Sequence, residues 1–93
     1  MGKTKILLVE DDKNINKLIN DYMSTHGFEV TAFEDGPDAL DHVQMRGLPH
    51  IALIDLTLPT MHGFDLSNRL KSMADVPIIF ITATSDTDTV VQG

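Results

Sequence analysis

The feature that constrains the fold most is a regular alternation of short apolar runs with segments of helical periodicity. The apolar runs are of β type, being rich in branched and aromatic residues. Between them, apolar positions recur at intervals of three and four residues, which is the spacing of an amphipathic helix. The expected strands cover residues 5–9, 28–33, 50–55 and 76–83, and the expected helices cover 13–26, the stretch from Pro37 to Gly47 and a stretch after Gly63.

The expected helices have recognisable ends and apolar faces. Asp12 precedes the first helix as an N-cap residue, Gly27 follows it at the C′ position, and Pro37 occupies a first helical position. Ser85 or Asp86 would cap a further helix in the tail, of which the chain holds about two turns. The residues expected to face the core are Ile15, Leu18, Ile19, Tyr22, Met23, Ala39, Leu40, Val43, Gln44, Leu66, Leu70 and Met73, with Phe33, Phe64 and Phe80 as further candidates.

The order of these elements predicts an α/β fold. Strands that are apolar along their whole length are typical of a parallel sheet covered by helices on both faces. Right-handed crossovers and a doubly wound arrangement give the strand order 2-1-3-4, with the second strand at an edge. The second strand alternates apolar Phe28, Val30 and Ala32 with polar Glu29 and Thr31, as a less buried edge strand would.

Acidic side chains stand where the first and third strands end. Glu10 and Asp11 follow the first strand directly, and Asp55 ends the third. Parallel strands end at one edge of the sheet, about 5 Å apart, so these carboxylates are expected to gather in one crevice with Thr82. Asp12 is interpreted as a helix cap instead. A purely structural role for Thr82 stays open, because threonine is common in strands.

Three carboxylates in one crevice need a compensating partner, because like charges at this distance repel unless one is protonated or a cation lies among them. Mg²⁺ prefers oxygen ligands and keeps several waters, which phosphoryl oxygens can replace. A carboxylate beside it can attack an activated phosphorus and form an aspartyl phosphate. The four histidines share no metal-site spacing and are interpreted as surface or packing residues.

Composition narrows the function classes. The 93 residues carry a formal net charge of −7, which argues against nucleic-acid contact by this segment. There is no cysteine, so disulfides and thiolate zinc sites are excluded. No apolar run approaches the roughly 18 residues of a membrane span, and the N-terminus does not have the pattern of a secretory signal. We therefore expect a cytoplasmic protein without membrane contact.

Three stretches together resemble the receiver domain of two-component response regulators. They are the acidic pair of VEDD at 9–12, the pattern Asp-x3-Pro-x3-Gly from Asp55 to Gly63, and PIIFITA at 77–83, in the family's order. The resemblance covers essentially the whole chain and implies a flavodoxin-like sheet, with 1–93 forming one receiver domain. It also implies that the fifth strand and last helix of the family are absent from this chain, and with them a phosphate-binding lysine.

The resemblance implies a role for each site residue. Asp55 would accept a phosphoryl group from the phosphohistidine of a sensor histidine kinase or a histidine phosphotransfer protein. Asp11 would bind Mg²⁺ directly, Glu10 directly or through water, and Thr57 through its backbone carbonyl. Thr82 would contact the phosphoryl group and act as a switch. The chain would be a phosphoacceptor that takes part in its own phosphorylation and dephosphorylation, and not an enzyme.

Departures from the family pattern leave two alternatives open. His62 stands where the family most often has Asp, at a loop position where little consequence is expected. The absent lysine leaves room for a receiver-like interaction module that accepts no phosphate. A haloacid-dehalogenase-like phosphatase would need a second Asp two residues after Asp55, where Thr57 stands. If the fourth strand is an unpaired edge, the isolated chain is expected to dimerise or aggregate, either through that strand or by exchanging elements between copies.

Overall fold

The structure is a computed structural model and describes residues 2–81 of the chain. Within that range, four strands form one parallel sheet with the order β2-β1-β3-β4, and three helices connect them. The strands are β1 (Lys5–Val9), β2 (Glu29–Phe33), β3 (Ile51–Asp55) and β4 (Ile78–Ile81), and the helices are α1 (Lys13–Thr25), α2 (Gly36–Arg46) and α3 (Gly63–Met73). The predicted fold class and strand order are confirmed.

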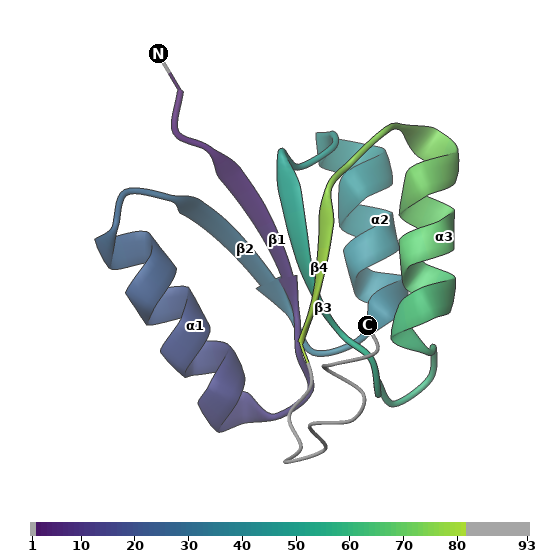
Figure 1. The fold of residues 1–93 in the computed structure, drawn as a ribbon, viewed down its shortest axis with the longest axis horizontal. Helices are drawn as coiled ribbons and strands as arrows, with labels where there is room; N and C mark the ends of the chain where they lie inside the picture. Colours follow the sequence, from purple (N-terminus) through teal and green to yellow (C-terminus); the bar gives the residue numbers. More distant parts are fainter. Residues whose placement is uncertain (1, 82–93) are drawn as a thin grey trace.

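The helices cover the two faces of the sheet unequally. Helix α1 lies on one face, and α2 and α3 lie side by side on the other (Figure 1). The register aligns the ends of the strands, since Val9 of β1 lies opposite Phe33 of β2 and Ile54 of β3. The residues that follow β1 therefore lie beside the last residue of β3. None of the helices described is long and apolar enough to cross a bilayer.

Two apolar layers hold the sheet between the helices. The larger one joins alternate residues of β1 and β3 to α2 and α3, and it includes Leu7, Ile54, Leu66 and Leu70, each at most 1% exposed. The smaller one lies on the α1 face, where Ile19 and Met23 pack against Leu8 and Leu53. Successive side chains of β1 and β3 point to opposite faces of the sheet, so each of these strands contributes to both apolar layers. This is expected of strands that are buried on both faces.

Of the three helix N-caps, the sequence predicted that of α1. Asp12 caps α1, and its Oδ1 accepts hydrogen bonds from the amides of Asn14 and Ile15 at 2.9 and 3.1 Å. Asp35 caps α2 ahead of Pro37, and His62 caps α3 by accepting from the Phe64 amide at 3.1 Å. His62 was predicted to be a loop residue of little consequence, whereas the structure gives its side chain this capping role. Gly27 follows α1 with φ at 90°, which favours glycine.

Four apolar residues predicted to lie in the core are exposed, and for these the prediction was wrong. They are Leu18 (69%), Tyr22 (60%), Phe64 (52%) and Met73 (38%). In α1 the packed positions are Ile19 and Met23, so Leu18 and Tyr22, each one residue earlier, lie at the rim of the apolar stripe. Phe64 opens α3 and Met73 ends it, and both lie outside the stripe of Leu66 and Leu70. Gln44, assigned to the core face of α2, is exposed as well.

Several predicted boundaries differ by a residue or two. β2 begins at Glu29 and β3 at Ile51, each one residue later than predicted, and α1 ends at Thr25. β4 is described from Ile78 to Ile81, so the predicted end of that strand at Thr82 and Ala83 lies outside the described residues, as does the predicted helix start at Ser85 or Asp86. The expectation of a homodimer and the expected incompleteness of the domain stay predictions.

Candidate metal centre

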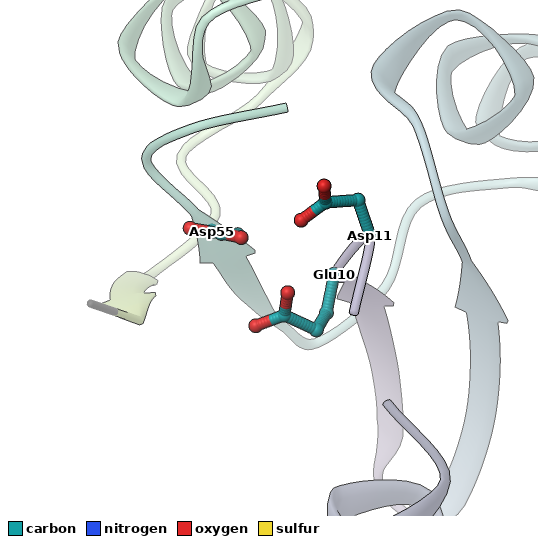
Figure 2. Close-up of side chains that lie close together, drawn as sticks. All are labelled: Glu10, Asp11 and Asp55. Carbon is teal, nitrogen blue, oxygen red and sulfur yellow. The ribbon is translucent and has the colours of Figure 1, made fainter. Parts of the chain in front are cut away.

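Three carboxylates meet at the carboxyl end of the sheet. Asp55 is the last residue of β3, and Glu10 and Asp11 directly follow β1, its neighbour in the sheet. One carboxylate oxygen from each lies within 4.8 Å of the others, and the three side chains point toward one another (Figure 2). The predicted gathering of Glu10, Asp11 and Asp55 is therefore confirmed as geometry.

Glu10 is the buried member of this acidic cluster. Its side chain is fully covered, with 0% exposure, and Oε2 accepts a hydrogen bond from the Asp12 amide at 3.0 Å. The other oxygen, Oε1, is buried and has no hydrogen-bond partner among the described residues. A buried carboxylate oxygen without a donor is costly, because it loses water and gains nothing in return. That cost disappears if a cation occupies the space among the three carboxylates.

The electrostatics of Glu10 reflect the same crowding. Burial raises the pKa of Glu10 from its ordinary value of 4.5 to about 7, and the carboxyl groups of Asp55 and Asp11 add to the rise. The hydrogen bond from the Asp12 amide acts in the opposite direction but is outweighed. In the absence of a cation, Glu10 therefore holds its proton to a higher pH than an ordinary glutamate does. A cation bound among the carboxylates would displace that proton.

Asp55 is held by the loop that follows it. Its side chain is 4% exposed, and Oδ1 accepts a hydrogen bond from the Thr57 amide at 3.1 Å. This is a local turn of the kind that aspartate favours. Oδ2 accepts no hydrogen bond from a described residue, so it is the oxygen left for other chemistry. Thr57 fixes the carboxylate by one oxygen and leaves the second available.

Gly63 closes the base of the same loop. Its amide donates to the Leu56 carbonyl at 2.8 Å, where α3 returns to the end of β3. A Cβ atom at this position would lie 2.3 Å from the Asp55 carbonyl oxygen and 2.8 Å from Leu56 Cα. Both contacts are with backbone, so no side-chain movement relieves them. The loop can pass this close to Asp55 because residue 63 has no side chain, which is consistent with its predicted loop-shaping role.

The donor set fits a hard divalent cation. Three carboxylates supply oxygen only, and one of their oxygens is buried without a hydrogen-bond partner in the part of the chain that the structure describes. Mg²⁺ takes oxygen ligands, commonly a few carboxylates completed by waters and phosphate oxygens. Asp11 is exposed, so the cluster is open on that side. The acidic cluster could therefore hold a metal ion with positions left for further oxygen ligands.

The remaining predicted site residues are placed as follows. Thr57 is exposed on the loop after β3, two residues beyond Asp55, and Asp12 serves as a cap outside the cluster. Thr82 lies outside the described residues, so its predicted contact with a phosphoryl group stays a prediction. Of the loop residues, Pro59 is exposed and Gly63 buried.

Sequence reasoning missed Asn16. Its Nδ2 donates to the Glu10 carbonyl at 2.9 Å and to the Phe33 carbonyl at 3.0 Å, so it holds the ends of β1 and β2 together beside the acidic cluster. The only signal in the sequence was a polar residue within the first helix, which is ordinary on an exposed face.

A groove of about 390 Å³ lies at the opposite end of the sheet, between β1, β2 and α2. Its lining includes Lys5 and Glu29, the first residues of their strands, and Arg46 at the end of α2. It contains none of the clustered carboxylates. The chemistry of the acidic cluster, and not the size of this groove, therefore locates the candidate site.

Comparison with known proteins points in the same direction. A sequence model of the response regulator receiver domain matches residues 6–93. Transcriptional regulatory protein CssR of Bacillus subtilis is 39% identical over 79 residues, which cover 84% of this chain and 34% of that protein. DNA-binding response regulator MtrA of Mycobacterium tuberculosis is 36% identical over 92 residues, covering 98% of this chain and 40% of that protein.

Solved structures share the fold. The BeF3-activated N-terminal receiver domain of RstA from Klebsiella pneumoniae superimposes with a TM-score of 0.79 and 30% identity, covering 94% of this chain and 74% of that one. The chain spans two fifths or less of the length of CssR and of MtrA, so the likeness concerns one part of each. The match over residues 6–93, the strand order and the acidic cluster agree: this chain belongs to the response regulator receiver domain family.

Proposed function

We propose that this chain is the phosphoryl-accepting signalling domain of a two-component system. A sensor histidine kinase or a histidine phosphotransfer protein would present a phosphohistidine, and Asp55 would accept the phosphoryl group with the help of Mg²⁺. The observation that carries the proposal is the meeting of Asp55 with Glu10 and Asp11 at one edge of the sheet, together with a buried oxygen of Glu10 that has no hydrogen-bond partner within residues 2–81. Family membership supports the reaction class.

The chain's own residues supply the nucleophile and its orientation. The Thr57 amide holds Asp55 Oδ1, which leaves Oδ2 as the attacking atom. Oδ2 forms the new P–O bond while the P–N bond to the donor imidazole breaks, and the imidazole nitrogen keeps the electron pair and takes a proton from solvent water. Bound Mg²⁺ would neutralise charge on the carboxylates and on the transferring phosphoryl group, a main part of such catalysis.

The proposed ligands of Mg²⁺ are Glu10, Asp11, Asp55 and the backbone carbonyl of Thr57. Asp11 is exposed and can bind directly, whereas Glu10 is buried and binds directly or through a water. The raised pKa of Glu10 implies that the cation and a proton compete for this group. Metal affinity is then expected to rise with pH through about 7.

The signalling role extends beyond the acceptor. We propose that Thr82 contacts the phosphoryl group and that its movement switches contacts with a partner or an output region. The chain would act as a phosphoacceptor and not as a turnover enzyme. Because one relative is described as a DNA-binding response regulator, we place this chain in the cytoplasm as the receiver of a regulator whose nucleic-acid contacts lie elsewhere.

Intact mass spectrometry tests the proposal. The chain is incubated with acetyl phosphate and Mg²⁺, with EDTA in a parallel sample, and compared with Asp55→Asn. We expect one phosphoryl adduct on the wild type that alkali or hydroxylamine removes, none with EDTA and none on the variant. Steady release of phosphate without an adduct would favour a phosphatase. No adduct in any sample would favour a receiver-like interaction module.

A further inference from the structure

The loop between β3 and α3 is fastened to the protein at its base, its middle and its tip. At the base the Gly63 amide bonds the Leu56 carbonyl, and in the middle Leu58 is buried in the core at 8% exposure. At the tip, Thr60 bonds Asp35, a residue of the turn between β2 and α2 that lies 25 positions earlier in the chain. The tip contact joins two loops that both end at the carboxyl edge of the sheet.

The contact between Thr60 and Asp35 uses both oxygens of the carboxylate. Thr60 Oγ1 donates to Oδ2 at 2.5 Å and the Thr60 amide donates to Oδ1 at 3.3 Å. Oδ1 also accepts from the Gly36 amide at 2.8 Å, which caps α2. Although desolvation raises the pKa of Asp35, these hydrogen bonds outweigh it and hold the pKa below its ordinary value. Asp35 is therefore ionised at neutral pH and available as an acceptor.

A second contact beside the first confirms that the loop tip rests on the start of α2. A Cβ atom on Gly36 would lie 2.9 Å from Met61 Sδ and 3.3 Å from Met61 Cβ. Met61 is partly buried against the larger core layer. Residues 60 and 61 at the loop tip thus pack against residues 35 and 36 at the start of α2. We name the pair Asp35 and Thr60 the loop clamp.

We propose that the loop clamp positions the β3–α3 loop for metal binding, so that Asp35 and Thr60 act as positioning residues for the site at Asp55. The inference rests on the proposed function, in which this loop carries the Thr57 carbonyl ligand and the Thr57 amide that orients Asp55. Thr57 and Thr60 are both exposed, so the stretch between them is held by buried Leu58 and by the clamp. Loss of the clamp frees the tip while the core anchor remains.

The expected change in Mg²⁺ affinity can be estimated from residues that support metal ligands in other proteins. Residues that orient metal ligands without touching the metal change its affinity by about 10–100-fold when they are removed. The loop clamp is less direct than such residues, because it holds the loop that carries the ligand and does not contact the ligand atom itself. We therefore expect about a tenfold loss of Mg²⁺ affinity.

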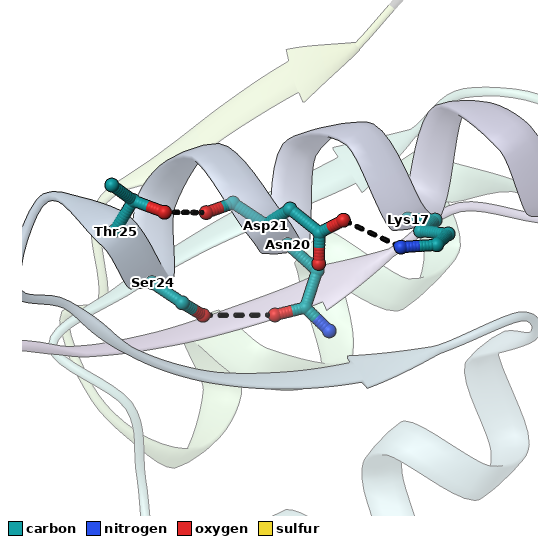
Figure 3. Close-up of polar contacts among 5 residues, drawn as sticks. All are labelled: Lys17, Asn20, Asp21, Ser24 and Thr25. Atoms are coloured by element: carbon teal, nitrogen blue, oxygen red, sulfur yellow. Dashed lines mark hydrogen bonds and ion pairs between the residues drawn. The ribbon is translucent and has the colours of Figure 1, made fainter.

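The test measures Mg²⁺ dissociation constants by following the Thr57 and Asp55 amide resonances during titration with the metal alone. The variants are Thr60→Ala, which removes the hydroxyl, and Thr60→Ser, which restores it. Thr25→Ala is the matched control, since its hydroxyl donates at 2.8 Å to the Asp21 carbonyl on an exposed part of α1 (Figure 3). Thermal melts of each protein show that every titration is done on folded chain.

We expect about tenfold weaker Mg²⁺ binding for Thr60→Ala, and near wild-type binding for Thr60→Ser and Thr25→Ala. Asp35→Ala removes both acceptor oxygens of the clamp, with the one that caps α2, and should weaken binding at least as much as Thr60→Ala. The double variant should bind no more weakly than Asp35→Ala alone. If Thr60→Ala does not fold, Asp35→Ala decides, provided that its thermal melt shows a folded chain. Wild-type affinity in folded Thr60→Ala or Asp35→Ala overturns the clamp proposal, and absence of Mg²⁺ binding by the wild type overturns the proposed function and the clamp together.

Discussion

Replacing Glu10 with Gln should make the metal-free protein more stable at alkaline pH. Gln is an analogue of the protonated carboxyl group, and its side-chain oxygen can still accept from the Asp12 amide. In the folded chain the pKa of Glu10 is about 7, against an ordinary value of 4.5. At 1.36 kcal/mol per pH unit, that difference means that ionised Glu10 destabilises the metal-free fold by up to about 3 kcal/mol.

The direction follows from proton linkage. Between the two pKa values the folded chain keeps a proton that the unfolded chain has lost, so the free energy of unfolding falls as pH rises. This decrease in the free energy of unfolding begins near pH 4.5 and is complete above about pH 7. About 2 kcal/mol of it falls between about pH 5.5 and about pH 8.5, while Glu10→Gln lacks this contribution. The variant's advantage over wild type should therefore widen by about 2 kcal/mol across that interval.

Urea unfolding in EDTA at these two pH values measures the difference. Comparing wild type with Glu10→Gln at each pH cancels the titration of all other groups, provided that the denaturant dependence of both proteins is the same. At alkaline pH, added Mg²⁺ should make the wild type more stable than Glu10→Gln, because only the wild type has a charged carboxylate at position 10 to bind the ion. A stability difference that does not change with pH would refute the assignment of a raised pKa to Glu10.

Other predictions follow from single contacts. Mg²⁺ that binds only the folded chain should stabilise it by about 2.7 kcal/mol at a hundredfold excess over its dissociation constant, and Asp11→Asn should reduce this gain in thermal melts; an equal gain in both proteins would contradict the ligand set. Gly63→Ala places a Cβ atom against the Asp55 carbonyl oxygen and should lower the free energy of unfolding by about 3 kcal/mol, as measured by urea unfolding. A decrease of less than about 1 kcal/mol would contradict this prediction. Asn16→Ala removes the donor to the Glu10 carbonyl and should cost about 1 kcal/mol, while no change in stability would show that the bond contributes nothing.

The strand order and the acidic cluster could be predicted because they depend on few physical rules. Apolar runs that end in carboxylates mark strand ends, and parallel pairing brings those ends to one edge. Asp12 could be separated from the cluster because an aspartate directly before a helical pattern is a strong capping signal. The close fit of Glu10, Asp11 and Asp55 then follows from the register of β1 and β3.

The errors and omissions have a different origin. The apolar positions of α1 predict a stripe, but the sheet covers only part of it, so Leu18 and Tyr22 at its rim are exposed. The depth of Glu10 was not predictable either, because its covering depends on how neighbouring loops close over β1. The contact of Thr60 with Asp35 joins residues 25 positions apart through side chains, and no local pattern encodes such a pair.

The central claim is that Asp55, and no other carboxylate of the cluster, accepts the phosphoryl group. The most direct measurement is to phosphorylate the chain with acetyl phosphate and Mg²⁺, reduce the acyl phosphate with borohydride, and sequence the peptides by tandem mass spectrometry. Reduction converts a phosphorylated aspartate to homoserine and so marks its position permanently. We predict homoserine at position 55 alone, with Glu10 and Asp11 unmodified. A reduced residue at position 10 or 11, or full phosphorylation with position 55 unchanged, would contradict the account.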